Sequence, residues 1–304
     1  MSVSTGYATW FTEDAAAFLD RAGEHLSRSP LTATVLTTVA QRVAAGQERG
    51  EDTKRTQYDW FAVVTDPDGG IAGTAMRTAP FAPYPPYLLA MPDGAAVELA
   101  RALLDRGEEV GGAAGELPAA DVFAAEIARA TGREVRRDLH MRLFRLGELV
   151  EPPLPPGRLR RAGQDEAGLA LEWYRVFHLD ADEQAGRDTG HGSRSEGFTL
   201  EEMGERIAEG RVWFWVDESD RPVHVTGCNR PAYGVARIGP VYTPKPHRGH
   251  GYASAAVAGV SRALLEEGAD VVALFTDQDN PTSNYIYPAL GYVPVTDTVE
   301  LLIS

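Results

Sequence analysis

Apolar and polar residues alternate along the chain with two periods, one typical of helices and one typical of strands. In the first half, helices are expected at Ala15–Leu26, Pro30–Gly46, Ala95–Leu104 and Ala119–Ala130. Strands are expected at Tyr58–Val64, Ile71–Thr78, Pro86–Met91, Glu109–Gly112 and Asp138–Leu146. The first two strands flank Asp66–Gly70, whose Pro-Asp-Gly-Gly sequence is typical of a hairpin turn.

The second half repeats this order of elements. Its helices are expected at Glu166–Phe177, Leu200–Glu209, Tyr252–Glu267 and Ser283–Ala289. Its strands are expected at Arg158–Arg161, Arg211–Val216, Val223–Cys228, Val235–Tyr242, Val271–Thr276 and Val293–Leu302. Strands that alternate with helices in this way predict an α/β fold with a mixed sheet in each half.

A proline-rich segment separates the two halves. Glu151–Gly157 contains four prolines, which can neither join a strand ladder nor sit inside a helix. The length of 304 residues is sufficient for two domains. We therefore predict a first domain over residues 1–150, a linker over 151–157 and a second domain over 158–304.

Composition narrows the class of protein. Hydrophobic residues make up 43% and charged residues 24%, as in ordinary globular domains, and apolar runs are too short to span a membrane. The first twenty residues lack the basic and apolar regions of a signal peptide, so a cytoplasmic protein is expected. A single cysteine, Cys228, excludes an internal disulfide and a four-cysteine zinc site, and no metal is expected.

The net charge bears on the choice of partner. Lys and Arg number 29 against 44 Asp and Glu, which gives −15. Such a chain repels the phosphates of nucleic acids and favours cationic small molecules, although the acidity also serves solubility. Whether the chain forms a homo-oligomer stays open.

The segment Arg248–Ala253 carries the most informative chemistry. It reads Arg-Gly-His-Gly-Tyr-Ala, lies between a strand and an amphipathic helix, and has the spacing R-x-x-G-x-A. Small residues let a diphosphate approach the backbone, and the free N–H groups and dipole of a helix N-terminus favour its negative charge. The third glycine of a dinucleotide fingerprint is missing, which disfavours hydride chemistry.

With its flanking segments, this half resembles the GCN5-related N-acetyltransferase (GNAT) family, whose acetyl-CoA signature is Q/R-x-x-G-x-G/A. The preceding Gly239–Thr243 looks like the splayed strand of the family, and Asn280–Tyr292 resembles its N-P-x-x-x-x-x-Y-x-x-x-G-F/Y ending. The resemblance covers residues 158–304. It implies an N-acetyltransferase that moves an acetyl group from acetyl-CoA to a small-molecule or peptide amine by direct attack.

The resemblance also implies roles for individual residues. The pantetheine arm would lie along the backbone of Val241, Tyr242 and Thr243, with Asn280 and Asn284 on its far side. The pyrophosphate would be held by the main-chain N–H groups of Arg248, Gly249, His250, Gly251, Tyr252 and Ala253. Tyr287 would protonate the leaving CoA thiolate, because a phenol with a pKa near 10 keeps its proton at neutral pH.

The residues leave the general base open. Asp277, Glu172, His224 and Tyr242 are candidates, and a chain of water molecules without a dedicated base is another. Alternation in Val223–Cys228 places His224 on one face with Thr226, where it either faces the acceptor or is a hydrogen-bonded core histidine. Asp277 either serves as the base or caps the turn that leads to Asn280.

Three further features have two interpretations each. Lys245 either approaches the 3′-phosphate of CoA or is a solvated lysine. The acidic loop formed by His178–Glu183, Asp188 and Glu196 either attracts a cationic amine or is simply solvated. Cys228 is expected to be a small buried side chain rather than a nucleophile.

The first half has no equivalent of the glycine-rich segment. At the matching position it reads Ala90-Met-Pro-Asp-Gly-Ala-Ala96, where Asp93 would repel a pyrophosphate. We interpret this half as a degenerate GNAT-like domain that does not bind CoA, the alternative being an unrelated α/β domain. For the whole chain, the alternatives to an N-acetyltransferase are a non-catalytic acyl-CoA sensor or interaction module and a transferase of longer acyl or aminoacyl groups.

Overall fold

The computed structural model describes residues 6–184 and 198–304, which divide into two compact units. Unit 1 contains the chain up to Met141 together with Thr296–Ser304, and unit 2 contains Arg142–Val295. This division differs from the expected boundary at the prolines. It falls inside strand β6 (Val135–Leu146), it places residues 151–157 within unit 2, and it assigns the end of the chain to unit 1.

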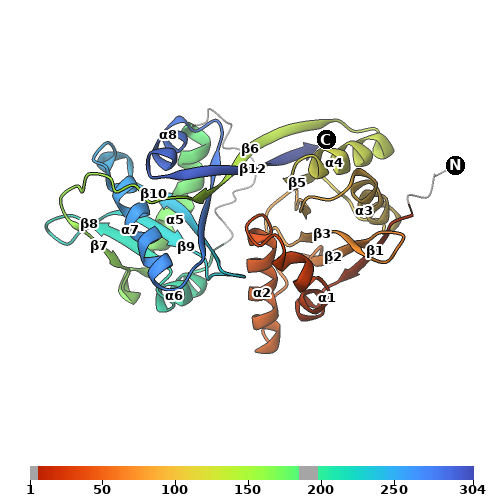
Figure 1. Cartoon of the computed structure of the whole chain (residues 1–304), viewed down its shortest axis with the longest axis horizontal. Coiled ribbons are helices and arrows are strands. Elements are labelled where there is room, and N and C mark those ends of the chain that lie inside the picture. Colours follow the sequence, from red (N-terminus) through yellow and green to blue (C-terminus); the bar gives the residue numbers. More distant parts are fainter. Residues whose placement is uncertain (1–5, 185–197) are drawn as a thin grey trace. The chain divides into compact units, whose positions relative to one another are not determined.

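Unit 1 is a sheet with helices on both faces (Figure 1). Its strands are β1 (Ala8–Thr12), β2 (Trp60–Thr65), β3 (Ile71–Arg77), β4 (Tyr87–Leu88), β5 (Gly112–Glu116) and the end of β12 (Tyr292–Ile303), adjacent in this order. Its helices are α1 (Ala15–Ser27), α2 (Thr34–Glu48), α3 (Asp93–Asp105) and α4 (Ala119–Thr131). The last strand, β12, runs antiparallel to β5, with Thr298 opposite Glu116 and Leu302 opposite Gly112.

The apolar run in β2 explains the three layers of unit 1. Trp60, Ala62 and Val64 pack with α3 and α4, whereas Phe61 and Val63 pack with α1 and α2. Both faces of the strand are therefore buried, as its continuous hydrophobic sequence requires.

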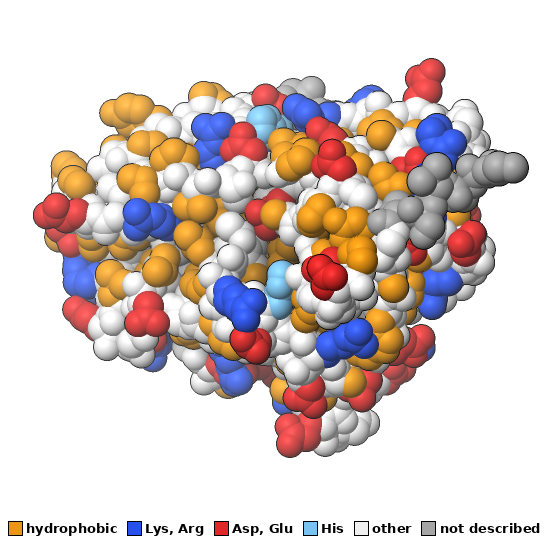
Figure 2. Space-filling model, turned by 45° about the vertical axis from the view of Figure 1, so that its right-hand side comes forward, with side chains coloured by type: hydrophobic (Ala, Val, Ile, Leu, Met, Phe, Trp, Pro, Cys, Tyr) orange, Lys and Arg blue, Asp and Glu red, His pale blue; other side chains and the backbone are white. Residues whose placement is uncertain are grey.

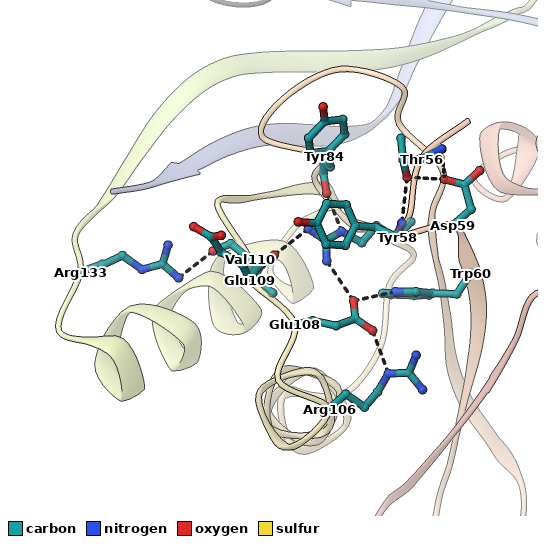
Figure 3. Close-up of polar contacts among 11 residues, drawn as sticks. Thr56, Tyr58, Asp59, Trp60, Tyr84, Arg106, Glu108, Glu109, Val110 and Arg133 are labelled. Carbon is teal, nitrogen blue, oxygen red and sulfur yellow. Dashed lines mark hydrogen bonds and ion pairs between the residues drawn. The ribbon is translucent and has the colours of Figure 1, made fainter. Parts of the chain in front are cut away.

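A buried ion pair lies where strand β3 of unit 1 ends (Figure 3). The guanidinium of Arg77 is 1% exposed, lies 2.9 Å from the carboxylate of Glu108 and donates hydrogen bonds to the carbonyls of Tyr84 and Glu109. Glu108 also accepts from the indole of Trp60 at 3.0 Å and from Arg106 at 2.8 Å. A buried charge with this many partners holds the ends of several elements together.

Unit 2 has the same three layers (Figure 1). Its strands are adjacent in the order β6, β11 (Val271–Asp277), β10 (Val235–Tyr242), β9 (Pro222–Cys228), β8 (Val212–Val216) and β7 (Arg158–Arg161). Its helices are α5 (Ala167–Gln184), α6 (Leu200–Ala208), α7 (Tyr252–Glu266) and α8 (Pro281–Ala289), with short 3-10 turns at Gln164–Glu166 and Lys245–His247.

Each face of the sheet in unit 2 has its own core. On one face, Val257 and Leu264 of α7 pack against Ile238 and Leu274. On the other face, Tyr174 of α5 packs with the core that contains α6 and β8. In the described parts of the chain, no helix is both long enough and apolar enough to cross a membrane.

The predicted mixed α/β fold class is confirmed, and the differences are local. Strand β1 was not predicted, β4 is limited to Tyr87–Leu88, and β5 begins where the predicted strand ends. Helix α5 continues to Gln184 instead of ending at Phe177, so the expected acidic loop at His178–Glu183 is helical.

Candidate functional site

Two parallel strands of unit 2 separate at their carboxyl ends. Strand β10 pairs with β11 from Val235–Ile238 alongside Val271–Leu274, after which β10 continues to Tyr242 and β11 to Asp277. The separation begins at Gly239-Pro240, where the pairing of β10 with β9 also shifts. Proline cannot donate a ladder hydrogen bond, and a shift of register bends the strand. The strand ends therefore present backbone groups to an extended ligand.

The connection from β10 to α7 is shaped by two glycines. Gly249 has a φ of 80° and Gly251, the N-cap of α7, a φ of 82°. A Cβ atom on either would meet nothing within 4 Å, so the backbone conformation, not lack of space, requires glycine. Within the described residues, the backbone N–H groups of residues 249–254 have no acceptor. Free N–H groups at the start of a long helix are typical of a phosphate site.

Side chains hold this connection in place. The guanidinium of Arg248 donates to the carbonyl of Thr243 at 3.0 Å and to the carboxylate of Asp180 on α5 at 2.6 Å. The hydroxyl of Tyr242 donates to the same carboxylate at 3.1 Å. Lys245 is 55% exposed, as expected for a solvated lysine, and it is paired with both Asp180 and Glu183. An approach to the 3′-phosphate of CoA stays a prediction.

These contacts change the interpretation of the acidic segment. The charges of Asp180 and Glu183 are paired with those of Lys245 and Arg248. Attraction of a cationic amine by this segment stays a prediction. Asp188 and Glu196 lie outside the described residues.

Tyr287, the predicted general acid, lies on α8 beside the separated strands. Its side chain is 8% exposed and belongs to the same apolar core as Ile238 and Leu274, the last paired residues of β10 and β11. Burial raises the pKa of its phenol, so the proton is retained at neutral pH. Its hydroxyl makes no hydrogen bond to the rest of the described chain.

The two predicted asparagines have structural partners. The side chain of Asn280 caps α8 by accepting from the N–H groups of Thr282 and Ser283. Asn284 accepts from Thr276 at 2.7 Å and donates to the carbonyls at the end of β11. Both asparagines therefore shape the wall of the site, and a direct contact with pantetheine stays a prediction.

The structure separates the candidates for the general base. His224 is fully buried, its two ring nitrogens are hydrogen-bonded to Thr243 and Thr226 at 2.7 Å each, and burial lowers its pKa to about 3. This is the pattern of a core histidine. Burial, followed by the hydrogen bond to Asp180, raises the pKa of Tyr242 to about 12, which keeps it protonated.

The remaining two candidates stay open. Asp277 accepts from the N–H of Asp279 at 3.0 Å, as expected for a residue that caps the turn. Glu172 is exposed on α5. Cys228, considered as a nucleophile, is buried, and burial raises the pKa of its thiol to about 11, which opposes a thiolate.

The matching junction of unit 1, between β4 and α3, is built differently. Asp93 begins α3, and a Cβ atom on Gly94 would lie 2.7 Å from the ring of Tyr7. The buried carboxylate of Glu116, at the end of β5, accepts from the N–H of Ala90. An N–H group of this junction is thus bound by the protein itself.

Neither a second pocket nor a metal centre offers an alternative site in the described residues. A hollow of about 690 Å³ in unit 1 is lined by residues that include Tyr58, Trp60 and Glu108, but Glu108 is already shared by three donors. In the described ranges, no three His, Cys, Asp or Glu side chains are grouped as metal ligands would be.

Comparisons with known proteins place this arrangement in a family. Residues 170–292 match the acetyltransferase (GNAT) family, whereas no curated protein matches the chain. A GCN5-related N-acetyltransferase from Sphaerobacter thermophilus is 18% identical, with a TM-score of 0.57 over 99% of this chain and 96% of that one. A GNAT-family acetyltransferase from Colwellia psychrerythraea is 12% identical, with a TM-score of 0.57 over 98% of each chain.

A tandem GNAT protein from the clavulanic acid biosynthesis pathway is 16% identical, with a TM-score of 0.55 over 98% of each chain. At such identities the likeness concerns the fold, which here extends over both units. The separated strands, the glycine-rich start of α7 and the family match at residues 170–292 agree with one another. The family match covers residues 170–292, and the fold over both units is that of solved GNAT acetyltransferases.

Proposed function

We propose that unit 2 is an N-acetyltransferase that transfers an acetyl group from acetyl-CoA to a primary amine. The observation that carries the proposal is the separation of β10 from β11 directly before a helix whose first N–H groups are free. An extended pantetheine arm needs unpaired strand backbone, and a pyrophosphate needs N–H donors at a helix N-terminus. Both requirements meet at this one place.

The donor would bind through main-chain groups. Val241 and Thr243 would pair with the amides of pantetheine, and the N–H groups from Gly249 to Ala253 would bind the pyrophosphate. The side chain of Arg248 is engaged by Thr243 and Asp180, so its contribution is to hold the loop.

The reaction would proceed by direct attack. The neutral amine adds to the thioester carbonyl, the tetrahedral intermediate collapses with cleavage of the C–S bond, and the amine nitrogen loses its proton to a base that the residues leave open. The CoA thiolate takes the proton of the Tyr287 phenol. Burial raises the pKa of that phenol, so it keeps its proton until the thiolate forms, and the same burial would raise the pKa of the thiol formed beside it.

The amine is proposed to be a cationic small molecule or peptide, with charge as its general attraction. The chain carries −15, and on the face in Figure 2 acidic side chains are scattered among basic ones without gathering into one field. Such a surface supports weak steering of a cation and disfavours nucleic acid.

The test is a calorimetric titration with acetyl-CoA, followed by an assay for free thiol with a panel of primary amines. We expect one site per chain and thiol release with at least one amine. Two sites would contradict the interpretation of unit 1. Binding without thiol release for any amine would favour a non-catalytic acyl-CoA-binding module, and a folded protein that does not bind would contradict the proposal.

A further inference from the structure

Helix α5 and the β10–α7 connection meet at one buried carboxylate, that of Asp180. Its side chain is 11% exposed. Three donors surround it, from Tyr242, Lys245 and Arg248, which lie at the start, the middle and the end of the segment that leads to Gly249. A buried carboxylate needs such partners, and here all of them come from this one segment.

Arg248 connects the two ends of that segment. One nitrogen of its guanidinium binds the carbonyl of Thr243, and another binds Asp180. Thr243 is fixed in turn by its hydrogen bond to the buried His224. Contacts therefore run without a break from His224 through Thr243 and Arg248 to Asp180. Together they fix the path of the backbone up to Gly249.

We infer that Asp180 is a positioning residue of the donor site, which holds the β10–α7 connection in the conformation that presents its free N–H groups. The inference rests on the proposed function. A loop that is already ordered costs less entropy when it binds a ligand, so the anchor contributes to affinity for the donor without touching it.

The negative charge of Asp180 makes it possible to distinguish a positioning role from a purely electrostatic one by the direction in which Kd changes. If the carboxylate acted only through its charge, its removal would strengthen the binding of the anionic CoA, since a negative group near the pyrophosphate would be lost. If it acts by positioning, its removal weakens binding. The two explanations predict opposite changes in Kd.

The experiment compares acetyl-CoA binding by calorimetry in the wild type, Asp180→Asn and Glu183→Gln. We expect Asp180→Asn to raise Kd about tenfold and to raise KM with kcat changed less than about twofold. Glu183→Gln, on the same helix but exposed and paired with Lys245, should leave Kd within about twofold. Unchanged or tighter binding in Asp180→Asn overturns the inference.

A double-variant cycle separates positioning from a general loss of structure. With Arg248→Gln as background, Asp180→Asn should raise Kd by clearly less than tenfold, because one of the three contacts through which Asp180 acts is already gone. A full tenfold cost in that background overturns the inference. The amides of His247, Arg248 and Ala255 are hydrogen-bonded within and beside the connection, and their hydrogen exchange in the ligand-free protein should be faster in Asp180→Asn.

If Asp180→Asn does not fold, Asp180→Glu keeps the charge and displaces it, and it should weaken binding and speed exchange in the same segment. Unchanged exchange in that variant contradicts the inference. A wild type that does not bind acetyl-CoA contradicts the proposed function instead, whereas normal wild-type binding with an unaffected Asp180→Asn contradicts the positioning role alone.

Discussion

The junctions β4–α3 of unit 1 and β10–α7 of unit 2 occupy the same place in the order of elements but differ in their connections. Residues 89–92 join the first pair and residues 243–251 the second. The longer connection contains two glycines with positive φ, whereas the shorter one ends in Pro92, directly before Asp93, the first residue of α3. Both units have a strand followed by a helix at this place, so we expect a difference in anion binding to come from the connection.

The buried carboxylates of the two junctions show the same difference. Glu116 binds an N–H of its own junction in unit 1, whereas Asp180 binds side chains and leaves the N–H groups of the second junction free. The N–H of Ala90 is thus satisfied inside the protein, whereas the first N–H groups of α7 are not. This difference supports the prediction that unit 1 does not bind CoA.

Removal of the buried charge of unit 1 should have the largest effect on the free energy of unfolding. Arg77→Met leaves Glu108 without its most buried partner, and we expect the free energy of unfolding to fall by about 3 kcal/mol. Urea unfolding measures this loss. The control is Arg77→Met with Glu108→Gln, which should recover part of it. A change of the acetyl-CoA Kd at unit 2 would contradict the purely structural role of this pair.

A bulky side chain at the start of α7 should block the donor. Gly251→Trp places an indole before the free N–H groups at a φ of 82°, and we expect Kd for acetyl-CoA to rise about 1,000-fold. Gly268→Trp is the matched control, because Gly268 follows the other end of the helix with a φ of 98° and equally open space. Equal affinities of the two variants would refute the assignment of the loop.

Loss of the Tyr287 hydroxyl should slow the reaction without affecting donor binding. Tyr287→Phe removes the proton donor, and we expect kcat to fall about 100-fold while Kd for acetyl-CoA stays within about twofold. Tyr285→Phe, on the same helix and 78% exposed, serves as the control. Steady-state kinetics measure kcat, and calorimetry measures Kd. An unchanged kcat in Tyr287→Phe would show that Tyr287 is not the general acid.

The smallest effect is expected at Glu116 of unit 1. Burial raises the pKa of Glu116, so the folded state holds its proton to higher pH than the unfolded state, and ionisation destabilises the fold as pH rises. Glu116→Gln removes this penalty. At pH 4 the variant and the wild type should differ little from this cause. At pH 7 the free energy of unfolding of the variant should rise relative to that of the wild type by up to about 1 kcal/mol, as urea unfolding would show. An equal difference at both pH values would contradict this.

Local signals allowed the fold class and the glycine-rich connection to be predicted. Gly249 and Gly251 are informative because a positive φ is a property of the residue itself. The roles of Asn280 and Asn284 could not be predicted from the sequence. A side-chain amide can either cap a helix or contact pantetheine, and the sequence does not distinguish the two.

Contacts between distant residues could not be predicted in this way. The carboxylate of Asp180 meets Arg248 only in the folded chain, and Glu183 likewise meets Lys245. These ion pairs stabilise acidic residues in the last turns of α5, where the sequence predicted a loop. The prolines at residues 151–157 gave a strong local signal for a boundary, yet the partner of β5 lies at the far end of the sequence.

That last strand has a consequence for synthesis on the ribosome. Strand β5 emerges early but finds its neighbour, Thr298–Leu302, only after unit 2 has been made (Figure 1). At about 5–20 residues per second, this delay amounts to roughly 10–40 s. During that time the nascent chain carries an unpaired strand edge, a template for aggregation. Unit 1 is first in the sequence and, by this arrangement, completes its fold last.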